Sequence, residues 1–335
     1  MSDSTGFFVW KLLLPAASGF TCYFLLRMLL GSSAFAVKLA LDHPNARSLH
    51  TEAKPRMGGV AMILSLTPAL FLAGLPSIAL PAIFLCLVSF FDDRYCLNAG
   101  VRLAAHALAT LSFLHLTFPD LTGVTFFASM LGTMWMINLF NFMDGSDGLA
   151  GGMALIGFGF LSYAACLGSH PSLSVATLCV SACALAFLCF NFPPAKIFLG
   201  DSGSVPLGFL AASLALYGLN GGTWPAYFPA IVFSPFIVDA SITLTKRILR
   251  REKIWCAHRE HYYQRVILMG WSHRKTALAG YTLMFLCGIL GALSISFPSA
   301  SSIVLMFLML SYAAFATLID WAWAVHSKSN ENPKT

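Results

Sequence analysis

The sequence predicts an all-α, polytopic integral membrane protein with about 11 transmembrane helices in one membrane-embedded domain, residues 1–335. Three observations lead to this fold class. Hydrophobic residues make up 58% of the chain and charged residues only 10%, whereas soluble domains carry roughly 25% charged residues. The mean hydropathy is strongly positive. Apolar runs long enough to cross a bilayer, about 20 residues each, recur along the whole chain.

The individual spans follow from these runs and from the Pro, Gly and charged residues that interrupt them. We expect them at residues 7–30, 58–76, 78–91, 102–118, 122–142, 149–168, 172–190, 205–220, 225–245, 276–297 and 301–325. Only the tripeptide Leu-Pro-Ser separates the second span from the third, so ten spans result if these two form a re-entrant pair.

Alternation of the spans across the bilayer sorts the basic residues onto one side. The segments that follow spans 1, 3, 5, 7, 9 and 11 hold 18 of the 20 Lys and Arg residues, namely Lys38, Arg47, Lys54, Arg56, Arg94, Arg102, Lys196, Lys246, Arg247, Arg250, Arg251, Lys253, Arg259, Arg265, Arg274, Lys275, Lys328 and Lys334. The opposite connections, such as TFPDLTG and LNGGTWP, hold none. The positive-inside rule therefore places the N-terminus outside and the C-terminus in the cytoplasm.

The composition also argues against other classes of protein. The net charge of +6 comes from residues scattered between apolar runs, without the aromatic-interleaved basic surface of a nucleic-acid-binding protein. The nine cysteines show no CxxC or Cys/His zinc spacing. The first apolar run follows MSDSTG, which lacks basic residues, and no A-x-A-like cleavage site ends the run. We therefore expect a retained span rather than a signal peptide.

Five carboxylates mark the cytoplasmic ends of the expected spans: Asp92, Asp93, Asp144, Asp147 and Asp201. An aspartate near hydrocarbon costs roughly 2.5–3.5 kcal/mol at a helix centre and less near the interface. A lone acid at such a place is most simply a helix cap. Five acids on one membrane face indicate instead that they bind cations, pair with nearby arginines, or do both.

Three motifs carry these acids. In FFDDRYC, the adjacent Asp92 and Asp93 repel each other unless a cation intervenes, which suits a metal site or a division between orientation and proton acceptance. In NFMDGSDGLAGG, the glycines indicate that one helix ends and another begins, with the acids at the turn. In KIFLGDSGSVPLG, a Gly-rich turn opens a helix, which offers N–H groups to an anion and Asp201 to a hard cation such as magnesium.

Two loops gather basic residues on the same side. DHPNARSLHTEAKPRMGG, residues 42–59, and RREKIWCAHREHYYQRV, residues 250–266, mix histidines with arginines. The first loop also fits a solvated loop that follows the positive-inside rule. The spacing in the second loop does not match the HExxH zinc signature, and its grouped His and Arg suit a phosphate-rich anion. The second loop also fits juxtamembrane charge that attracts anionic lipid. Asp239 lies inside the ninth span, where it is either functional or a structural hydrogen-bond partner of a neighbouring helix.

Together these features indicate a magnesium-assisted reaction on a phosphorylated cytosolic substrate, with a lipid as the other partner. Phosphoryl transfer requires mainly positioning and charge neutralisation from the protein. A membrane transporter is the first alternative, but it would place polar residues near mid-span and often contain a repeat, which we do not find between the halves. A non-catalytic scaffold explains each motif alone but not their joint order.

In this order, the motifs DHPNARSLH with PRMGG, FDDR, NFMDGSDGLAGG, FLGDSGS and HREH resemble those of the polyprenyl-phosphate N-acetylhexosamine-1-phosphate transferases, the glycosyltransferase family 4 enzymes that include WecA and MraY. The resemblance covers roughly residues 40–275. It implies transfer of a sugar 1-phosphate from a UDP-N-acetylhexosamine to undecaprenyl phosphate, with release of UMP. It also implies Mg²⁺, or Mn²⁺ in its place, and an active site on the cytoplasmic face of the bacterial inner membrane. A homodimer is left open.

The resemblance implies roles for individual residues as well. The site would be built from loops at about 38–58, 92–102, 141–152, 191–204 and 246–275. Its implied catalytic residues are Asp92, Asp93, Asp144 and Asp147, and its implied metal ligands are Asp201 and Asn141. One aspartate of the adjacent pair would activate the lipid phosphate, as a base or as a nucleophile. An aromatic side chain would lie against the uracil, and the implied substrate-binding residues are Phe198, Arg56, Arg102, Asn191, His258, Arg259 and His261.

Two departures from the family pattern bear on the substrate. The muramoyl-pentapeptide branch typically carries adjacent histidines in the last loop and a lysine soon after the acidic pair, whereas this chain has HREHYYQRV and Arg94. The last loop looks more like the O-antigen-type branch that includes WbpL, whose sugars are N-acetylated and often 6-deoxy. We therefore expect a role in O-antigen, lipopolysaccharide or other cell-envelope polysaccharide synthesis, with phospho-MurNAc-pentapeptide transfer in peptidoglycan synthesis as the alternative.

Overall fold

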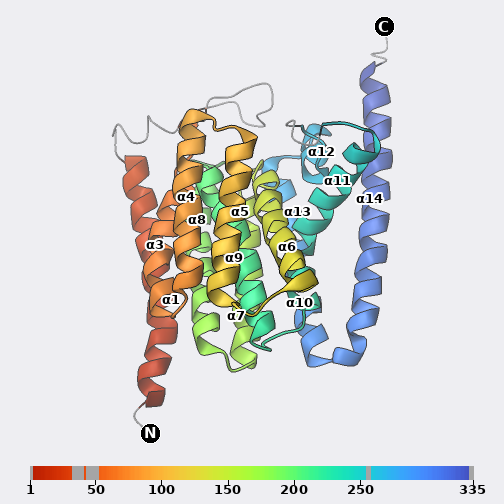
Figure 1. The fold of residues 1–335 in the computed structure, drawn as a ribbon. Helices are drawn as coiled ribbons and strands as arrows, with labels where there is room; N and C mark the ends of the chain where they lie inside the picture. Colours follow the sequence, from red (N-terminus) through yellow and green to blue (C-terminus); the bar gives the residue numbers. More distant parts are fainter. Residues whose placement is uncertain (1–2, 32–40, 43–52, 254–257, 332–335) are drawn as a thin grey trace.

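The computed structural model describes residues 3–31, 41–42, 53–253 and 258–331, and these form an all-α bundle (Figure 1). The helices are α1 (Asp3–Gly31), α3 (Gly58–Leu72), α4 (Pro76–Tyr95), α5 (Ala99–Thr117), α6 (Gly123–Phe142), α7 (Leu149–Leu167), α8 (Pro171–Asn191), α9 (Asp201–Asn220), α10 (Tyr227–Val232), α11 (Ser234–Leu249), α12 (Tyr262–Leu268), α13 (His273–Ser296) and α14 (Ser301–Glu331), with a short 3₁₀ turn, η1 (Pro298–Ala300). Two dipeptide strands, β1 (Leu41–Asp42) and β2 (Lys54–Pro55), pair antiparallel. The predicted fold class is confirmed.

Each of the expected spans coincides with a helix or a pair of helices. In the described part of the chain, nine helices are long and apolar enough to cross a membrane: α1, α4, α5, α6, α7, α8, α9, α13 and α14. The expected second span is the shorter apolar α3, of 15 residues. Several boundaries follow from local chemistry, because Pro76 and Pro171 start α4 and α8, where a missing N–H costs nothing.

The expected ninth span, 225–245, is wrong as a single helix. It is broken at Phe233 into α10 and α11. Pro235 follows the break directly, and a proline there cannot donate the backbone hydrogen bond that would continue the helix. The break is buried among other helices, which is where a membrane protein tolerates interrupted helices.

The buried centre of the bundle consists of α7, α8 and α9, whereas α1, α6 and α14 are the least buried of the long apolar helices (Figure 1). Phenylalanines fill much of the core, including Phe113, Phe140, Phe158, Phe187, Phe209, Phe228, Phe233 and Phe236. The exposed apolar faces of the outer helices are those that lipid would cover.

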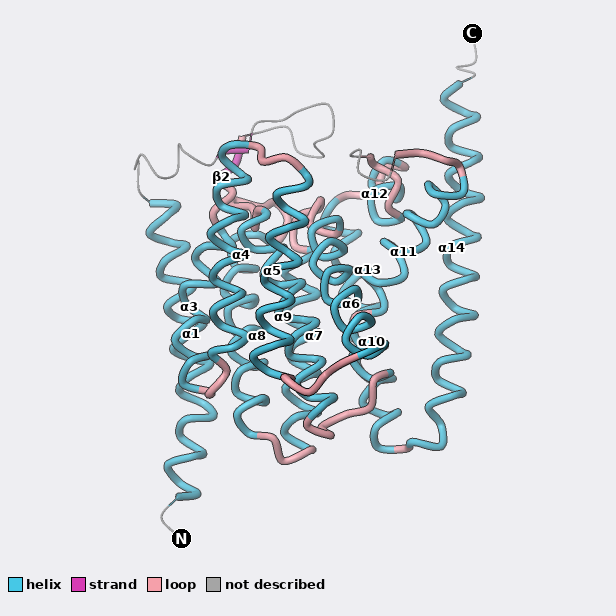
Figure 2. Tube along the Cα trace, viewed as in Figure 1, coloured by secondary structure: helices cyan, strands magenta, loops and turns pink. Residues whose placement is uncertain are grey.

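The loops in Figure 2 gather at the two ends of the bundle. One end carries the connection between α4 and α5, the turn between α6 and α7, the start of α9, and α12 (Figures 1 and 2). We call it the site end. The C-terminus lies toward the site end and the N-terminus toward the opposite one (Figure 1). All five sequence-predicted acids therefore lie at one end of the bundle.

Candidate functional site

The site end brings Asp93 of α4 against the start of α9. The Asp93 side chain, 3% exposed, accepts hydrogen bonds from the backbone N–H groups of Asp201 at 3.4 Å and Ser202 at 3.3 Å. Gly200 precedes them with φ +73°, and a Cβ there would lie 2.9 Å from Asp93 Oδ2. Only glycine allows this approach, so the LGDSG sequence places two acids from distant helices side by side.

Asn141 joins this pair from the last turn of α6. Its Nδ2 lies 3.4 Å from Asp201 Oδ2, and its Oδ1 accepts a hydrogen bond of 3.0 Å from Ser204 Oγ. The helix ends one residue later, at Phe142, and α7 begins at Leu149. The prediction that NFMDGSDGLAGG is a helix end and a helix start is confirmed.

Asp144 lies in the turn between α6 and α7. Burial raises the pKa of its carboxyl well above the usual value, and the negative charge of Asp201 raises this pKa further, while Arg56 opposes both effects. A carboxylate in this setting favours a cation. Asp144 therefore contributes to a shared negative site rather than to a single ion pair.

Asp147 and Asn191 hold the polypeptide loops together. Asp147 Oδ2 accepts a hydrogen bond of 2.9 Å from the Ala195 N–H. Asn191 Oδ1 accepts from the Gly148 N–H, and Asn191 Nδ2 donates to the Ile197 carbonyl, both at 2.8 Å. Asn191 is buried and uses both ends of its amide inside the protein, so its visible contacts position the loop after α8.

The adjacent acids Asp92 and Asp93 face different partners. Asp92 Oδ1 accepts from the Leu97 N–H at 2.8 Å, and Asp92 Oδ2 lies 3.4 Å from Arg102 Nη1. Arg56 Nη1 lies 3.9 Å from Asp93 Oδ1. Asp92 therefore stabilises the turn between α4 and α5 and orients Arg102, whereas Asp93 faces the start of α9.

Phe198 lies at the edge of the acidic residues. Its N–H donates to the Pro55 carbonyl at 2.8 Å, which fixes the strand β2 beside it, and Lys54 Nζ lies 5.4 Å from the centre of its ring. The half-buried ring thus combines an aromatic surface with a nearby cation. These are groups that can stack on a nucleobase and attract its phosphates.

The loop that carries His258, Arg259, Glu260 and His261 enters α12. Burial, together with the electrostatic effects of the neighbouring His261 and Arg247, lowers the pKa of His258 to about 4. His261 is buried, and its ring lies nearly parallel to that of Phe142, with centres 5.9 Å apart. The loop therefore lies against the end of α6 that leads to the acidic turn. Arg259 is half-buried in this loop.

Asp239 is the residue that holds this loop. Its carboxylate lies 3.2 Å from His261 Nδ1 and accepts backbone hydrogen bonds from Tyr262 at 2.9 Å and Tyr263 at 3.0 Å. Of the two interpretations of this intramembrane acid, the contacts favour a structural hydrogen-bond partner, here of α12 rather than of a long neighbouring helix.

The oxygen-rich donors at the site end fit a magnesium ion. Among the described residues, no three His, Cys, Asp or Glu side chains lie close enough to hold an ion unaided. Mg²⁺ usually takes one or two carboxylates, with water and substrate phosphates as its other ligands. Asp93 and Asp201 supply carboxylate oxygens of this kind, while Asn141 turns its Nδ2 toward Asp201 and its Oδ1 toward Ser204 Oγ.

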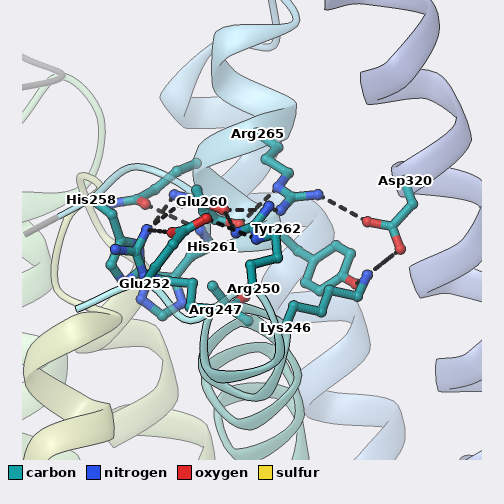
Figure 3. Close-up of polar contacts among 12 residues, drawn as sticks. Lys246, Arg247, Arg250, Glu252, His258, Glu260, His261, Tyr262, Arg265 and Asp320 are labelled. Atoms are coloured by element: carbon teal, nitrogen blue, oxygen red, sulfur yellow. Dashed lines mark hydrogen bonds and ion pairs between the residues drawn. The ribbon is translucent and has the colours of Figure 1, made fainter. Parts of the chain in front are cut away.

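Sequence reasoning missed a set of charged residues around Glu260, which Figure 3 shows: Lys246, Arg247, Arg250, Arg265 and Asp320. Asp320 lies inside the expected last span, so the rule that an acid in a membrane span is functional could have identified it. Lys38, together with Arg47 and His50 of the first basic loop, lies outside the described residues, as do residues 254–257 of the second basic loop.

Comparisons with known proteins extend these observations. The profile of the family described as glycosyl transferase family 4 matches residues 75–219. A probable undecaprenyl-phosphate N-acetylglucosaminyl 1-phosphate transferase of Bacillus subtilis is 30% identical over 276 residues, which cover 76% of this chain and 77% of that protein. A decaprenyl-phosphate N-acetylglucosaminephosphotransferase of Mycobacterium tuberculosis is 28% identical, with 84% and 82% covered. A phospho-N-acetylmuramoyl-pentapeptide-transferase of Picosynechococcus is 33% identical, with 51% and 54% covered.

Proposed function

Because the chain belongs to glycosyl transferase family 4 and is a membrane-bound glycosyl-1-phosphate transferase that acts on polyprenyl phosphate, we propose that it transfers an N-acetylhexosamine 1-phosphate from a UDP-sugar to undecaprenyl phosphate. The products would be undecaprenyl-diphosphate-sugar and UMP. We further propose that the reaction depends on Mg²⁺ and takes place on the cytoplasmic face of a bacterial inner membrane, where it initiates O-antigen or another cell-envelope polysaccharide.

The observation that carries this proposal is the convergence of acids from separate helices at one end of the bundle. Asp93 lies within hydrogen-bond distance of the start of α9, and Asp201 lies close to Asn141. The negative charges of Asp201 and Asp93 both raise the pKa of Asp144. A transporter would need its polar groups near the middle of the membrane, so this arrangement favours chemistry at the membrane surface.

The proposed reaction needs little covalent chemistry from the protein. An oxygen of the lipid phosphate attacks the β-phosphorus of the UDP-sugar, the bond from that phosphorus to the bridging oxygen breaks, and UMP leaves. Phosphate monoesters have a second pKa of about 6, so the attacking phosphate is largely deprotonated at neutral pH without a strong base. The bound Mg²⁺ would neutralise charge on the diphosphate and the leaving group.

Protein residues would then orient the two substrates. Phe198, with Lys54 Nζ 5.4 Å from the centre of its ring, would receive the uracil, and Lys54 an adjacent phosphate. Arg56, beside Asp93, and the loop with His258 and His261 would hold the diphosphate and the sugar. Asp93 and Asp201 would hold the metal, which would supply the charge neutralisation that this reaction requires.

The proposal is tested with a panel of donors. Purified protein is incubated with undecaprenyl phosphate, Mg²⁺ and one UDP-sugar at a time, and UMP and the lipid product are identified by mass spectrometry. We expect UMP and a diphosphate-linked lipid from at least one UDP-N-acetylhexosamine, and no UMP after chelation of Mg²⁺. Absence of UMP with every donor, together with substrate-dependent uptake into proteoliposomes, would favour a transporter instead.

Transfer of phospho-MurNAc-pentapeptide is the second candidate. It is favoured by the similarity to the Picosynechococcus protein, which covers about half of this chain. The same panel decides between the two when it includes UDP-MurNAc-pentapeptide. We expect this donor to be a poor substrate, because the last loop reads HREHYYQRV and lacks adjacent histidines.

A further inference from the structure

Polar contacts at Asp320 and Tyr312 tie the C-terminal helix α14 to the rest of the protein. Tyr312 Oη lies 2.7 Å from Ser234 Oγ near the break between α10 and α11. Nearer the site end, Asp320 contacts Lys246 of α11 and Arg265 of α12 (Figure 3). An apolar cavity of about 410 Å³ lies between α11, α13 and α14. Because side chains do not fill that space, the polar contacts contribute more than apolar packing to holding α14 against α12.

Arg265 is the buried link in this arrangement. Its side chain is 7% exposed. Its Nη1 lies 2.9 Å from Asp320 Oδ1, and its Nε donates a hydrogen bond of 2.8 Å to the Glu260 backbone carbonyl. The guanidinium therefore contacts α14 with one edge and the histidine loop with another. Because the guanidinium is planar and rigid, a shift of α14 at one edge moves the loop at the other edge more directly than a flexible side chain would.

Lys246 completes the polar contacts of Asp320. Its Nζ contacts Asp320 Oδ2 and lies 2.7 Å from Tyr262 Oη, which is itself 3.3 Å from the same carboxylate oxygen. Asp320 thus touches α11 through Lys246 and α12 through both Tyr262 and Arg265 (Figure 3). One carboxylate sets the separation between three helices.

The contacts continue from Arg265 to the acidic turn. Glu260, whose carbonyl Arg265 holds, is followed by His261, which lies against Phe142. Tyr263 Oη donates a hydrogen bond of 3.0 Å to the Phe142 carbonyl, and Phe142 is the last residue of α6, two residues before Asp144. A displacement of Arg265 would therefore shift the loop that carries His258 and His261 relative to the acidic turn.

We propose that Asp320 is a positioning residue for donor binding, which holds the histidine loop, residues 258–261, in place through Arg265. The inference rests on the proposed role of that loop in binding the UDP-sugar. Asp320 itself touches no reacting group. Without the Asp320 carboxylate, the buried guanidinium of Arg265 keeps the Glu260 backbone carbonyl and, as its one carboxylate, the more distant Glu260 side chain, 3.7 Å away. An undercompensated buried charge rearranges toward solvent.

The alternative is that Asp320 merely anchors α14. In that case its removal would loosen α14 in the same way as removal of the Tyr312 hydroxyl, and the loop would not change. The two roles are separated by hydrogen exchange of a peptide that covers residues 258–268, measured together with the steady-state constants for the donor.

The experiment compares Asp320→Asn with the parent, with Asp320→Glu, and with two controls. Trp321→Leu changes the neighbouring side chain, which is 70% exposed, and Tyr312→Phe removes the other polar contact. We expect Asp320→Asn to exchange about tenfold faster in residues 258–268 and to raise the donor KM about tenfold, with kcat within about threefold of the parent. Asp320→Glu should recover part of both effects, and the controls should show neither.

Unchanged exchange in Asp320→Asn, or equal acceleration in Tyr312→Phe, would overturn the proposal, and so would a loss confined to kcat. If Asp320→Asn is not isolated as a folded protein, the double variant Asp320→Asn/Arg265→Gln, which removes both charges, is measured against the same expectations. If the parent releases no UMP from any donor, the proposed function fails, while the exchange comparison still decides whether Asp320 positions the loop.

Discussion

Replacing Gly59 with alanine tests whether the close approach of α3 to α9 holds Asp201 against Asp93. A Cβ at Gly59 would lie 2.2 Å from both the Cα and the N of Gly203, and 2.6 Å from the carbonyl carbon of Ser202. These are backbone atoms, which cannot rotate away. The two helices would have to separate by about 1.2 Å, the difference between 2.2 Å and the 3.4 Å at which ordinary contact begins.

Movement of α9 by that distance carries Asp201 and Ser202 away from Asp93 of α4. Asp93 accepts its hydrogen bonds from Asp201 and Ser202 at 3.4 and 3.3 Å, so a further ~1 Å breaks both. Misplacement of a reacting group by about 1 Å costs roughly 100-fold in rate, and overpacking of a core costs about 1–3 kcal/mol of stability. We expect Gly59→Ala to lose about 100-fold in kcat/KM and to unfold at a lower temperature.

The assay is UMP release with the best donor, combined with thermal unfolding in detergent. Gly132→Ala is the matched control, because it is also a glycine-to-alanine change within an apolar helix, and nothing lies within 4 Å of its added Cβ. Alanine gains about 0.5–1 kcal/mol of helix propensity at Gly132 in the middle of α6, whereas Gly59 is the second residue of α3. If Gly59→Ala equals Gly132→Ala in activity and stability, the close approach does not hold the site and the reasoning is refuted.

Three further predictions concern other parts of the site end. Burial alone would raise the pKa of Glu260, but contacts with Arg250 and Arg247 outweigh this effect and lower the pKa. The Glu260 carboxylate therefore stabilises the folded protein fully at pH values above its ordinary pKa of about 4.3. This contribution is lost only as the pH falls through the lowered pKa of the folded protein. The deficit in unfolding temperature of Glu260→Gln should thus be constant from about pH 5 to 8 and shrink below about pH 4, and a deficit that changes between pH 5 and 8 would contradict this. In a variant that keeps only the exposed Cys96, an impermeant thiol reagent should label the protein in inverted vesicles but not in intact spheroplasts. A variant whose only cysteine is Asp120→Cys should show the reverse pattern. Labelling of Cys96 in spheroplasts would invert the proposed orientation. Phe198→Leu should raise the KM for the UDP-sugar about tenfold through lost stacking and leave the KM for undecaprenyl phosphate unchanged, whereas an equal effect in Phe192→Leu would argue against a specific contact with uracil.

Most of the fold was predictable because hydropathy and helix-breaking residues carry it directly. Pro171 and the glycines after Phe142 start or end helices close to where the sequence indicated, whereas Pro76, which the expected second span included, starts α4. The break at Phe233 was not predicted, because the residues on both sides of it are equally apolar and only Pro235 marks it. Helix α12 was also missed, since its seven residues are stabilised by Asp239 from another helix.

The site was predictable in its location more than in its detail. Alternation of the spans places Asp92, Asp93, Asp144, Asp147 and Asp201 at one end from sequence alone. It cannot distinguish Asp92 from Asp93, because neighbouring residues on a helix point about 100° apart, and packing decides which one faces α9. Asn191 illustrates the same limit, since both ends of its amide are used within the protein. Asp320 and Arg265, which form an ion pair, are 55 residues apart in the sequence. No local sequence pattern therefore predicts their contact.

The most direct test of a catalytic acidic site is UMP release from matched aspartate-to-asparagine variants. Asp93→Asn, Asp144→Asn and Asp201→Asn change the acids that converge at the site end. Asp120→Asn makes the same change at an exposed residue between α5 and α6, at the opposite end of the bundle. We expect each of the first three variants to lose at least about 100-fold in kcat and Asp120→Asn to match the parent. Parental rates of UMP release from the three site-end variants would contradict the account.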